Sequence, residues 1–139
     1  MAAKVNRHER LKQALALAAT VKTVLVATAH TDGSPHVAVA GRIEALPRGR
    51  VAVSEWFCPG TVSNLERNPR ISLVLWDPAE DAGYQLTGQV EEVEESAFLN
   101  GYLPEGEGAR PVPQTRRRLT VRVTGIFAFS RAPHTDEEE

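Results

Sequence analysis

Hydrophobic residues follow a helical pattern at the start of this 139-residue chain and strand-like patterns after it. Within residues 6–19, Leu11, Ala14, Leu15 and Ala18 recur at helical spacing among strong helix formers, which predicts an opening amphipathic helix. From residue 23 onward, β-branched and alternating segments lie between Gly- and Pro-containing turns. That change of period is typical of strands joined by tight connections.

Six segments have the pattern of strands: residues 23–29, 36–45, 50–56, 71–76, 84–93 and 120–130. An Asp32-Gly33 step and a Pro47-containing turn separate the first three, so we expect these to be antiparallel hairpins. Gly88 lies in the middle of the fifth segment and predicts a bulge or a bend there. Two short helices, at 62–67 after an N-cap at Thr61 and at 96–102, complete the prediction, with a loop over 103–114.

The predicted fold is mainly β with short helices, in a single domain over residues 1–139. Six antiparallel strands in a chain of this length are best satisfied by closing into a small barrel, because closure removes exposed edges. A leading helix within residues 1–20 precedes the barrel. The acidic run Asp136–Glu139 predicts a disordered tail over 133–139.

Composition narrows the function classes. Apolar residues make up 42% of the chain, without a run of about 18 that could span a membrane. The polar start has no signal-peptide pattern, so we expect a cytoplasmic protein. A net charge of −2 gives no reason to expect nucleic-acid binding. The single Cys58 excludes an intrachain disulfide and a Cys-only zinc site.

Of the 16 basic residues, only Lys4, Lys12 and Lys22 are lysines. Any anion held by the body of the protein must therefore meet Arg, hydroxyls or backbone N–H groups. The loop at Gly60 leads into a predicted helix, whose free N–H groups and the Thr61 hydroxyl could hold a phosphate. An ordinary capped connector helix explains the same residues equally well.

Metal binding is not expected. His30, His36 and His134, with Cys58, lack any recognised ligand spacing.

Three stretches resemble motifs of the FMN-binding split-barrel superfamily, which includes pyridoxamine 5′-phosphate oxidase relatives and small FMN-binding proteins. They are LVATAHTDGSPHV at 25–37, TVSNLERNPRISL at 61–73 and YQLTGQVE at 84–91, and their order and spacing agree with the superfamily. The resemblance implies a six-stranded antiparallel Greek-key split barrel. It also implies a homodimer with FMN at the interface between subunits.

Carried over by position, the resemblance implies an FMN site of three parts. Backbone contacts to the isoalloxazine edge would come from Val39, Ala40, Gly41 and Arg42. Contacts along the ribityl chain or ring would come from Ser54 and Glu55. Contacts to the phosphate would come from Gly60, Thr61 and Asn64.

Two features of the sequence depart from the family pattern, one at Gly60 and one at the C-terminal end. Relatives often carry Lys or Arg just before the helix threonine, where this chain has Gly60. Arg42, Arg67, Arg70 or an Arg of a partner chain would have to replace that charge. The C-terminal signature of true pyridoxamine phosphate oxidases is missing, so oxidation of vitamin B6 is not expected.

The resemblance thus implies a flavoprotein, with FMN carrying electrons between a small-molecule substrate or NAD(P)H and an acceptor. No Rossmann glycine motif is present for a resident nicotinamide cofactor. Three other interpretations stay open: a non-enzymatic FMN carrier or electron-transfer protein, a deazaflavin (F420)-binding relative, and a flavin-free barrel that acts as a binding module.

Overall fold

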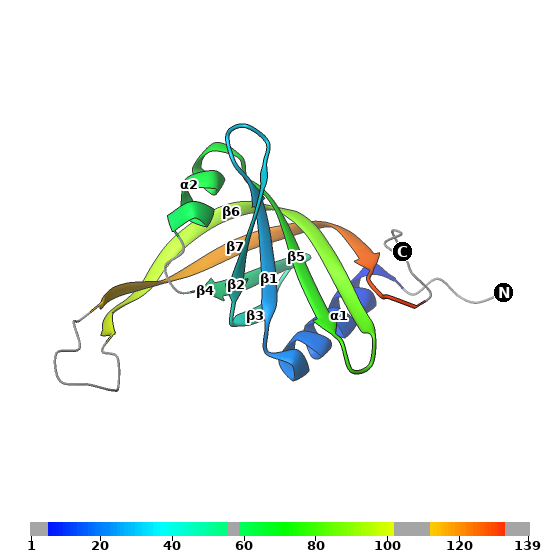
Figure 1. The fold of residues 1–139 in the computed structure, drawn as a ribbon. Coiled ribbons are helices and arrows are strands. Elements are labelled where there is room, and N and C mark those ends of the chain that lie inside the picture. The colour runs from blue at the N-terminus through cyan, green and yellow to red at the C-terminus, as the bar shows by residue number, and fades with distance from the viewer. Residues whose placement is uncertain (1–5, 56–58, 102–111, 133–139) are drawn as a thin grey trace.

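The chain folds into one antiparallel sheet with two helices (Figure 1). The computed structural model describes residues 6–55, 59–101 and 112–132; for residues 55, 59, 95–101 and 112–116 only the backbone is described. In chain order the elements are α1 (Arg7–Val21), β1 (Val24–Ala29), β2 (Pro35–Ala40), β3 (Arg42–Leu46), β4 (Arg50–Glu55), α2 (Pro59–Arg67), β5 (Arg70–Asp77), β6 (Ala82–Gly101) and β7 (Val112–Ala128). The predicted mainly β class is confirmed.

The sheet order is β2-β1-β5-β6-β7-β4-β3, which places two consecutive strands, β2 and β3, at opposite ends of the list. The described residues form seven strands rather than the predicted six, because the segment 36–45 is not one strand. Ala40 pairs with Val24 of β1, whereas Arg42 pairs with Ser54 of β4. The chain changes partners at Gly41, and this step between the two ends of the sheet gives the split barrel its shape.

The predicted helix over 96–102 is wrong: the backbone up to Gly101 continues β6. The predicted loop over 103–114 is also too long, since β7 begins at Val112. Pairing between the two strands explains both differences, with Phe98 opposite Thr115. Hydrogen bonds to a partner strand override local helix preference here. Figure 1 shows this end of β6 and β7 as a two-stranded ribbon extending beyond the rest of the sheet.

Gly88 lies at an irregularity in the β6–β7 pairing, as the sequence predicted. A Cβ atom added there would be 2.5 Å from the backbone oxygen of Arg122. Glycine therefore allows the two strands to approach each other at this bend.

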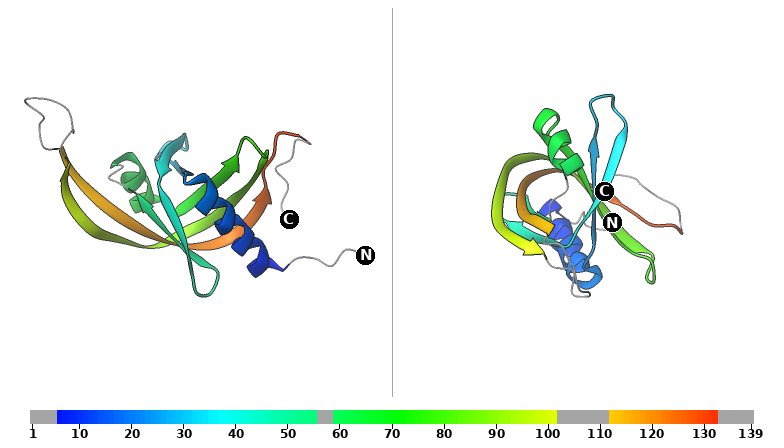
Figure 2. Two further views of the ribbon diagram at one scale, coloured as in Figure 1. Left: turned by 90° about the horizontal axis from the view of Figure 1, so that it is seen from below. Right: turned by 60° about the vertical axis from the view of Figure 1, so that its left-hand side comes forward.

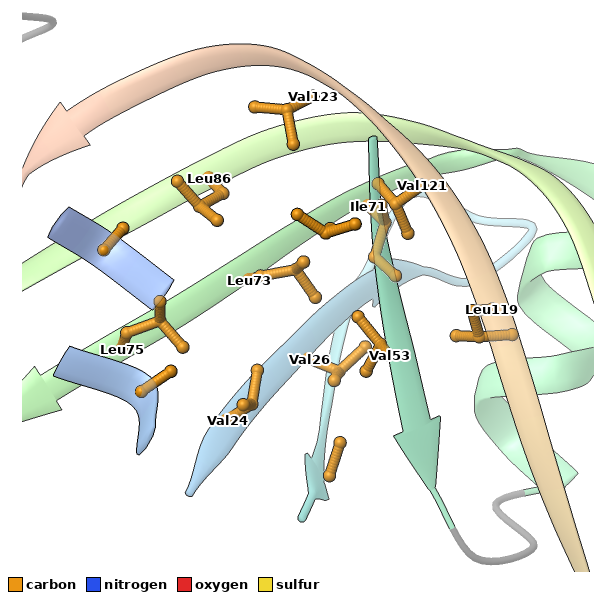
Figure 3. Packing of buried hydrophobic residues seen from close by; sticks show 14 of the residues in the cluster. Val24, Val26, Val53, Ile71, Leu73, Leu75, Leu86, Leu119, Val121 and Val123 are labelled. Carbon is orange, nitrogen blue, oxygen red and sulfur yellow. The ribbon is translucent and has the colours of Figure 1, made fainter. Parts of the chain in front are cut away.

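The core lies on the inner face of the sheet, under α1 (Figures 2 and 3). The Asn6 side chain caps α1 by accepting from the Glu9 backbone N–H at 2.8 Å. The helix packs on β3 and β5. Its buried side chains are Leu11, Ala14 and Ala18. They join aliphatic residues of the strands, among them Val24, Val26, Val53, Ile71, Leu73, Leu75, Leu86, Leu119, Val121, Val123 and Ile126. Neither described helix is long and apolar enough to cross a membrane.

Candidate functional site

Helix α2 begins at Pro59, three residues before the predicted start at Val62 after an N-cap at Thr61. Proline suits a first helical position because its fixed φ fits the helix and it has no N–H to leave unpaired. Thr61 therefore lies inside the first turn and is not the N-cap. Because helical bonds run from residue i to residue i−4, the N–H groups of Gly60 and Thr61 have no acceptor within the helix. The start of α2 consequently carries partial positive charge.

One face of α2 is buried against the first hairpin. The helix contacts β1 and β2, and Thr61, Asn64 and Leu65 are its buried side chains. Asn64 joins the helix to β1: its Nδ2 donates to Thr28 Oγ1 at 3.0 Å, and its Oδ1 lies 3.0 Å from His30 Nδ1. Since the amide nitrogen donates to Thr28, the amide oxygen is left to accept from the His30 ring.

Thr61 has no such partner. Its side chain is fully buried, and its Oγ1 atom makes no hydrogen bond within the described structure. A buried hydroxyl without a partner costs about 1–3 kcal/mol of stability. It lies one helical turn before Asn64 and so faces the same hairpin. A ligand oxygen held at the start of α2 would give this hydroxyl the partner that it lacks.

His36 fills the space beside Gly60. A Cβ atom added to Gly60 would be 3.0 Å from Cε1 and 3.1 Å from Nε2 of the His36 ring. The His36 ring also meets the His30 ring edge-on, with centroids 5.1 Å apart and planes at 61°. Six residues thus form one group, called the helix-start cluster below: Thr28, His30, His36, Gly60, Thr61 and Asn64.

Two charged side chains, those of Asp32 and Arg67, lie near the helix-start cluster and are bonded to other residues. Asp32, in the turn between β1 and β2, accepts from the hydroxyl and the N–H of Ser34. These bonds lower the pKa of the Asp32 carboxyl, and the nearby His30 adds a smaller lowering effect. Arg67 is the last residue of α2 and donates to Thr31 Oγ1 at 2.6 Å.

The arginines proposed to replace the missing charge at Gly60 occupy three different places. Arg67 is seven residues beyond Gly60 in α2, which is a rise of about 10 Å along the helix axis. Arg42 is exposed and forms an ion pair with Glu44 at 2.8 Å. Arg70 lines a groove of about 380 Å³ with residues of β1, β5, β6 and β7, and Thr28 of the helix-start cluster lines the same groove.

The predicted ring contacts form a second group at the other end of β2. Val39 is exposed, Ala40 is buried, and Gly41 has open space beside it. Arg42 pairs with Ser54 across β3 and β4, which brings these two predicted residues together. The side chain of Glu55 lies outside the described part of the structure, as do all atoms of Cys58.

The two groups are connected by β2. His36 and Gly41 are five strand residues apart, which corresponds to about 17 Å. The predicted site is therefore elongated, with polar groups at the helix-start cluster and exposed backbone at the Gly41 end. The sequence analysis did not place Thr28, His30 and His36 at the candidate site. The predicted turn at Asp32-Gly33 could have found them, because hairpin pairing sets Thr28 opposite His36.

An exposed apolar surface lies on the same two strands, on the face of β2 opposite the His36 side chain. Val37 and Val39 of β2 are 60% and 61% exposed, and Leu25, which pairs with Val39, is 38% exposed. Side chains at alternate positions share one face of a sheet, so the three form one patch.

Within the described residues, no three His, Cys, Asp or Glu side chains come together as a metal site would require.

The sequence model of the pyridoxamine 5′-phosphate oxidase family matches residues 11–128. An uncharacterised protein of Methanocaldococcus jannaschii is 27% identical over 112 residues, which cover 79% of this chain and 74% of that protein.

Solved structures share the fold. A pyridoxamine 5′-phosphate oxidase-related, FMN-binding protein from Nostoc punctiforme has a TM-score of 0.62 at 9% identity, and the match covers 91% of this chain and 86% of that one. An F420 reductase has a TM-score of 0.53 at 17% identity, with 78% and 94% covered. Since the family match spans most of the sequence and the strands follow a split-barrel order, the chain belongs to the pyridoxamine 5′-phosphate oxidase family.

Proposed function

We propose that this protein binds FMN and acts as an oxidoreductase on a small molecule. The phosphate of FMN would lie at the helix-start cluster, against the N–H groups of Gly60 and Thr61. The ring would lie toward Val39–Arg42 and Ser54. The observation that carries this proposal is the buried, unpartnered hydroxyl of Thr61 at the start of a helix. A phosphate oxygen at this place would satisfy both the hydroxyl and the helix N–H groups.

The residues present fit each part of that ligand. Asn64 is fixed by its bonds to Thr28 and His30, and therefore holds the wall of the phosphate end in place. At the other end, the open space beside Gly41 leaves the backbone accessible to a flat ring. FMN supplies two-electron transfer when it is bound, and the protein supplies position and electrostatics.

A homodimer is part of the proposal. The exposed patch of Leu25, Val37 and Val39 is apolar and lies on the same strands as the site. A second copy that covers this patch would also enclose a ring, since cofactor pockets are concave and mostly apolar. The alternative function is that of a carrier, which binds FMN without converting a substrate.

The test begins with the purified protein. We expect a flavin absorption spectrum, and mass spectrometry of the molecule released by denaturation should identify FMN. The same measurement would identify a deazaflavin, the second candidate, which the fold likeness to an F420 reductase supports. A colourless protein that also leaves the fluorescence of added FMN unchanged would contradict the proposed function.

A further inference from the structure

The phosphate end of the proposed site needs more positive charge than the helix supplies. A phosphate monoester carries close to two negative charges near neutral pH. The start of a helix offers about half a positive charge. Arg42 is paired with Glu44, and Arg67 lies at the far end of α2 on Thr31. The imidazoles of His36 and His30, beside Gly60, are groups that can become cations at the start of α2.

His36 is placed to fill this role. Its Nε2 is 3.1 Å from the position that a Cβ atom of residue 60 would take. The imidazole therefore stands where the side chain of a cationic residue 60 would begin. Its ring is only partly buried, so it can exchange protons with solvent.

His30 supports this arrangement. Asn64 Oδ1 accepts from His30 Nδ1, so the proton of the neutral His30 ring sits on Nδ1. The Nε2 atom is then the place where a second proton would be added. The His30 and His36 rings are 5.1 Å apart, and two imidazolium ions at this separation repel each other. An anion beside both rings removes the main obstacle to charging them.

We propose that His36, positioned by His30, supplies the charge that meets the phosphate of FMN, so that FMN binding takes up a proton. This inference rests on the proposed function, because it assigns the recognition of the phosphate within the same site. The proton comes from solvent, forms an N–H bond on the His36 ring and returns to solvent when FMN dissociates. No bond between heavy atoms changes.

Two charged groups lie near the histidines, namely Asp32 in the β1–β2 turn and Arg67 at the end of α2. Neither is bonded to a histidine ring: the Asp32 carboxylate is held by Ser34, and the Arg67 guanidinium by Thr31. The bound phosphate would therefore be the main partner of the His36 charge.

The first experiment compares FMN with riboflavin, which lacks the phosphate. Affinities are measured by fluorescence titration at about pH 7 and about pH 8.5, where the phosphate of FMN is already a dianion. We expect FMN affinity to fall up to about tenfold per pH unit, as the uptake of one proton requires. Riboflavin affinity should not change. Calorimetry in two buffers of different ionisation enthalpy then counts the protons taken up.

The second experiment removes the charge. His36→Gln should weaken FMN by about tenfold to a hundredfold at pH 7, which is the range for a charge-assisted hydrogen bond. It should also abolish the pH dependence and leave riboflavin binding unchanged. His8→Gln is the matched control, because His8 is exposed on α1, away from the helix-start cluster. We expect native FMN affinity and native pH dependence from this control.

The third experiment replaces the charge. The double variant Gly60→Lys, His36→Ala removes the ring that a residue-60 side chain would meet and adds a cation that stays charged up to high pH. We expect FMN binding close to the native affinity at pH 7, without loss at pH 8.5. A His36→Ala single variant provides the comparison, and circular dichroism checks that each variant is folded.

The outcomes separate the two proposals. If FMN binds with one affinity at both pH values and His36→Gln does not weaken it, the inference is wrong and the proposed function stands. Equal affinities for FMN and riboflavin also overturn the inference, because the phosphate is then not recognised. If neither flavin binds at any pH, the proposed function is wrong, and the inference fails with it. Should His36→Gln not fold, the folded double variant still decides the question through its pH dependence.

Discussion

Replacing Thr61 by Val should stabilise the protein without its cofactor and weaken cofactor binding at the same time. The substitution keeps the branched shape of the side chain and exchanges only the hydroxyl for a methyl group. Thr and Val have similar helix propensities, so α2 itself should not change. The Thr61 hydroxyl is fully buried and unpartnered, which makes it a cost to the flavin-free protein.

The expected magnitudes follow from that burial. Removing an unsatisfied buried hydroxyl should raise the free energy of unfolding of the flavin-free protein by about 1–3 kcal/mol. For a domain of this size, each kcal/mol corresponds to a rise of roughly 2–5 °C in melting temperature. Loss of a hydrogen bond to a phosphate should weaken FMN by about 1.5–3 kcal/mol, or roughly tenfold to a hundredfold in affinity.

The assay is urea denaturation of the flavin-free protein together with fluorescence titration by FMN. Thr28→Val serves as the control, because the Thr28 hydroxyl accepts from Asn64 at 3.0 Å. This control removes a buried acceptor and should lower the free energy of unfolding by about 1–3 kcal/mol. The two Thr-to-Val changes are therefore expected to have opposite signs. A flavin-free Thr61→Val protein that is less stable than the native one, or that binds FMN equally well, would refute the reasoning.

Three other predictions concern the sheet and its surface. Gly88→Ala should destabilise the protein by about 3 kcal/mol or more, since its Cβ would lie 2.5 Å from the Arg122 backbone oxygen; denaturation measures this, and a loss under about 1 kcal/mol would contradict the close approach. The Asp81 carboxylate accepts from the Arg131 N–H at 2.8 Å, which lowers its pKa, so its contribution to stability should be complete above about pH 4 and lost as the pH falls further. Melting curves of Asp81→Asn should therefore show less acid sensitivity than those of the native protein. Val39→Glu should turn the proposed dimer into a monomer in sedimentation experiments; an unchanged dimer would place the interface elsewhere.

Local signals predicted the fold where the relevant interactions are themselves local. The helical spacing of Leu11 and Ala14 predicted α1, because the same spacing builds the face that the sheet buries. The Asp32-Gly33 step predicted the first hairpin, since its conformation is set within four residues. Gly88 predicted the irregularity in β6, because a glycine within a strand indicates a bulge or bend whichever strand pairs with it.

Non-local pairing accounts for what the sequence did not reveal. The break at Gly41 could not be predicted, because a single residue between two alternating segments is shorter than a hairpin turn. It becomes visible only when Ala40 and Arg42 are seen to pair with different strands. The sequence does not reveal that the end of β6 is a strand, because the strand that pairs with it begins only at Val112, after a long intervening segment.

The phosphate end of the candidate site depends on the same kind of pairing. In the sequence, Gly60 reads as a missing cation and His36 as an isolated histidine 24 positions earlier. In the structure, the absence of a side chain at Gly60 is what leaves room for the His36 ring. The missing side chain at residue 60 and the neighbouring imidazole are thus two parts of one arrangement. Under the proposal the positive charge at this place appears only with a proton, so the pH dependence of FMN affinity is the direct test of the phosphate end of the site.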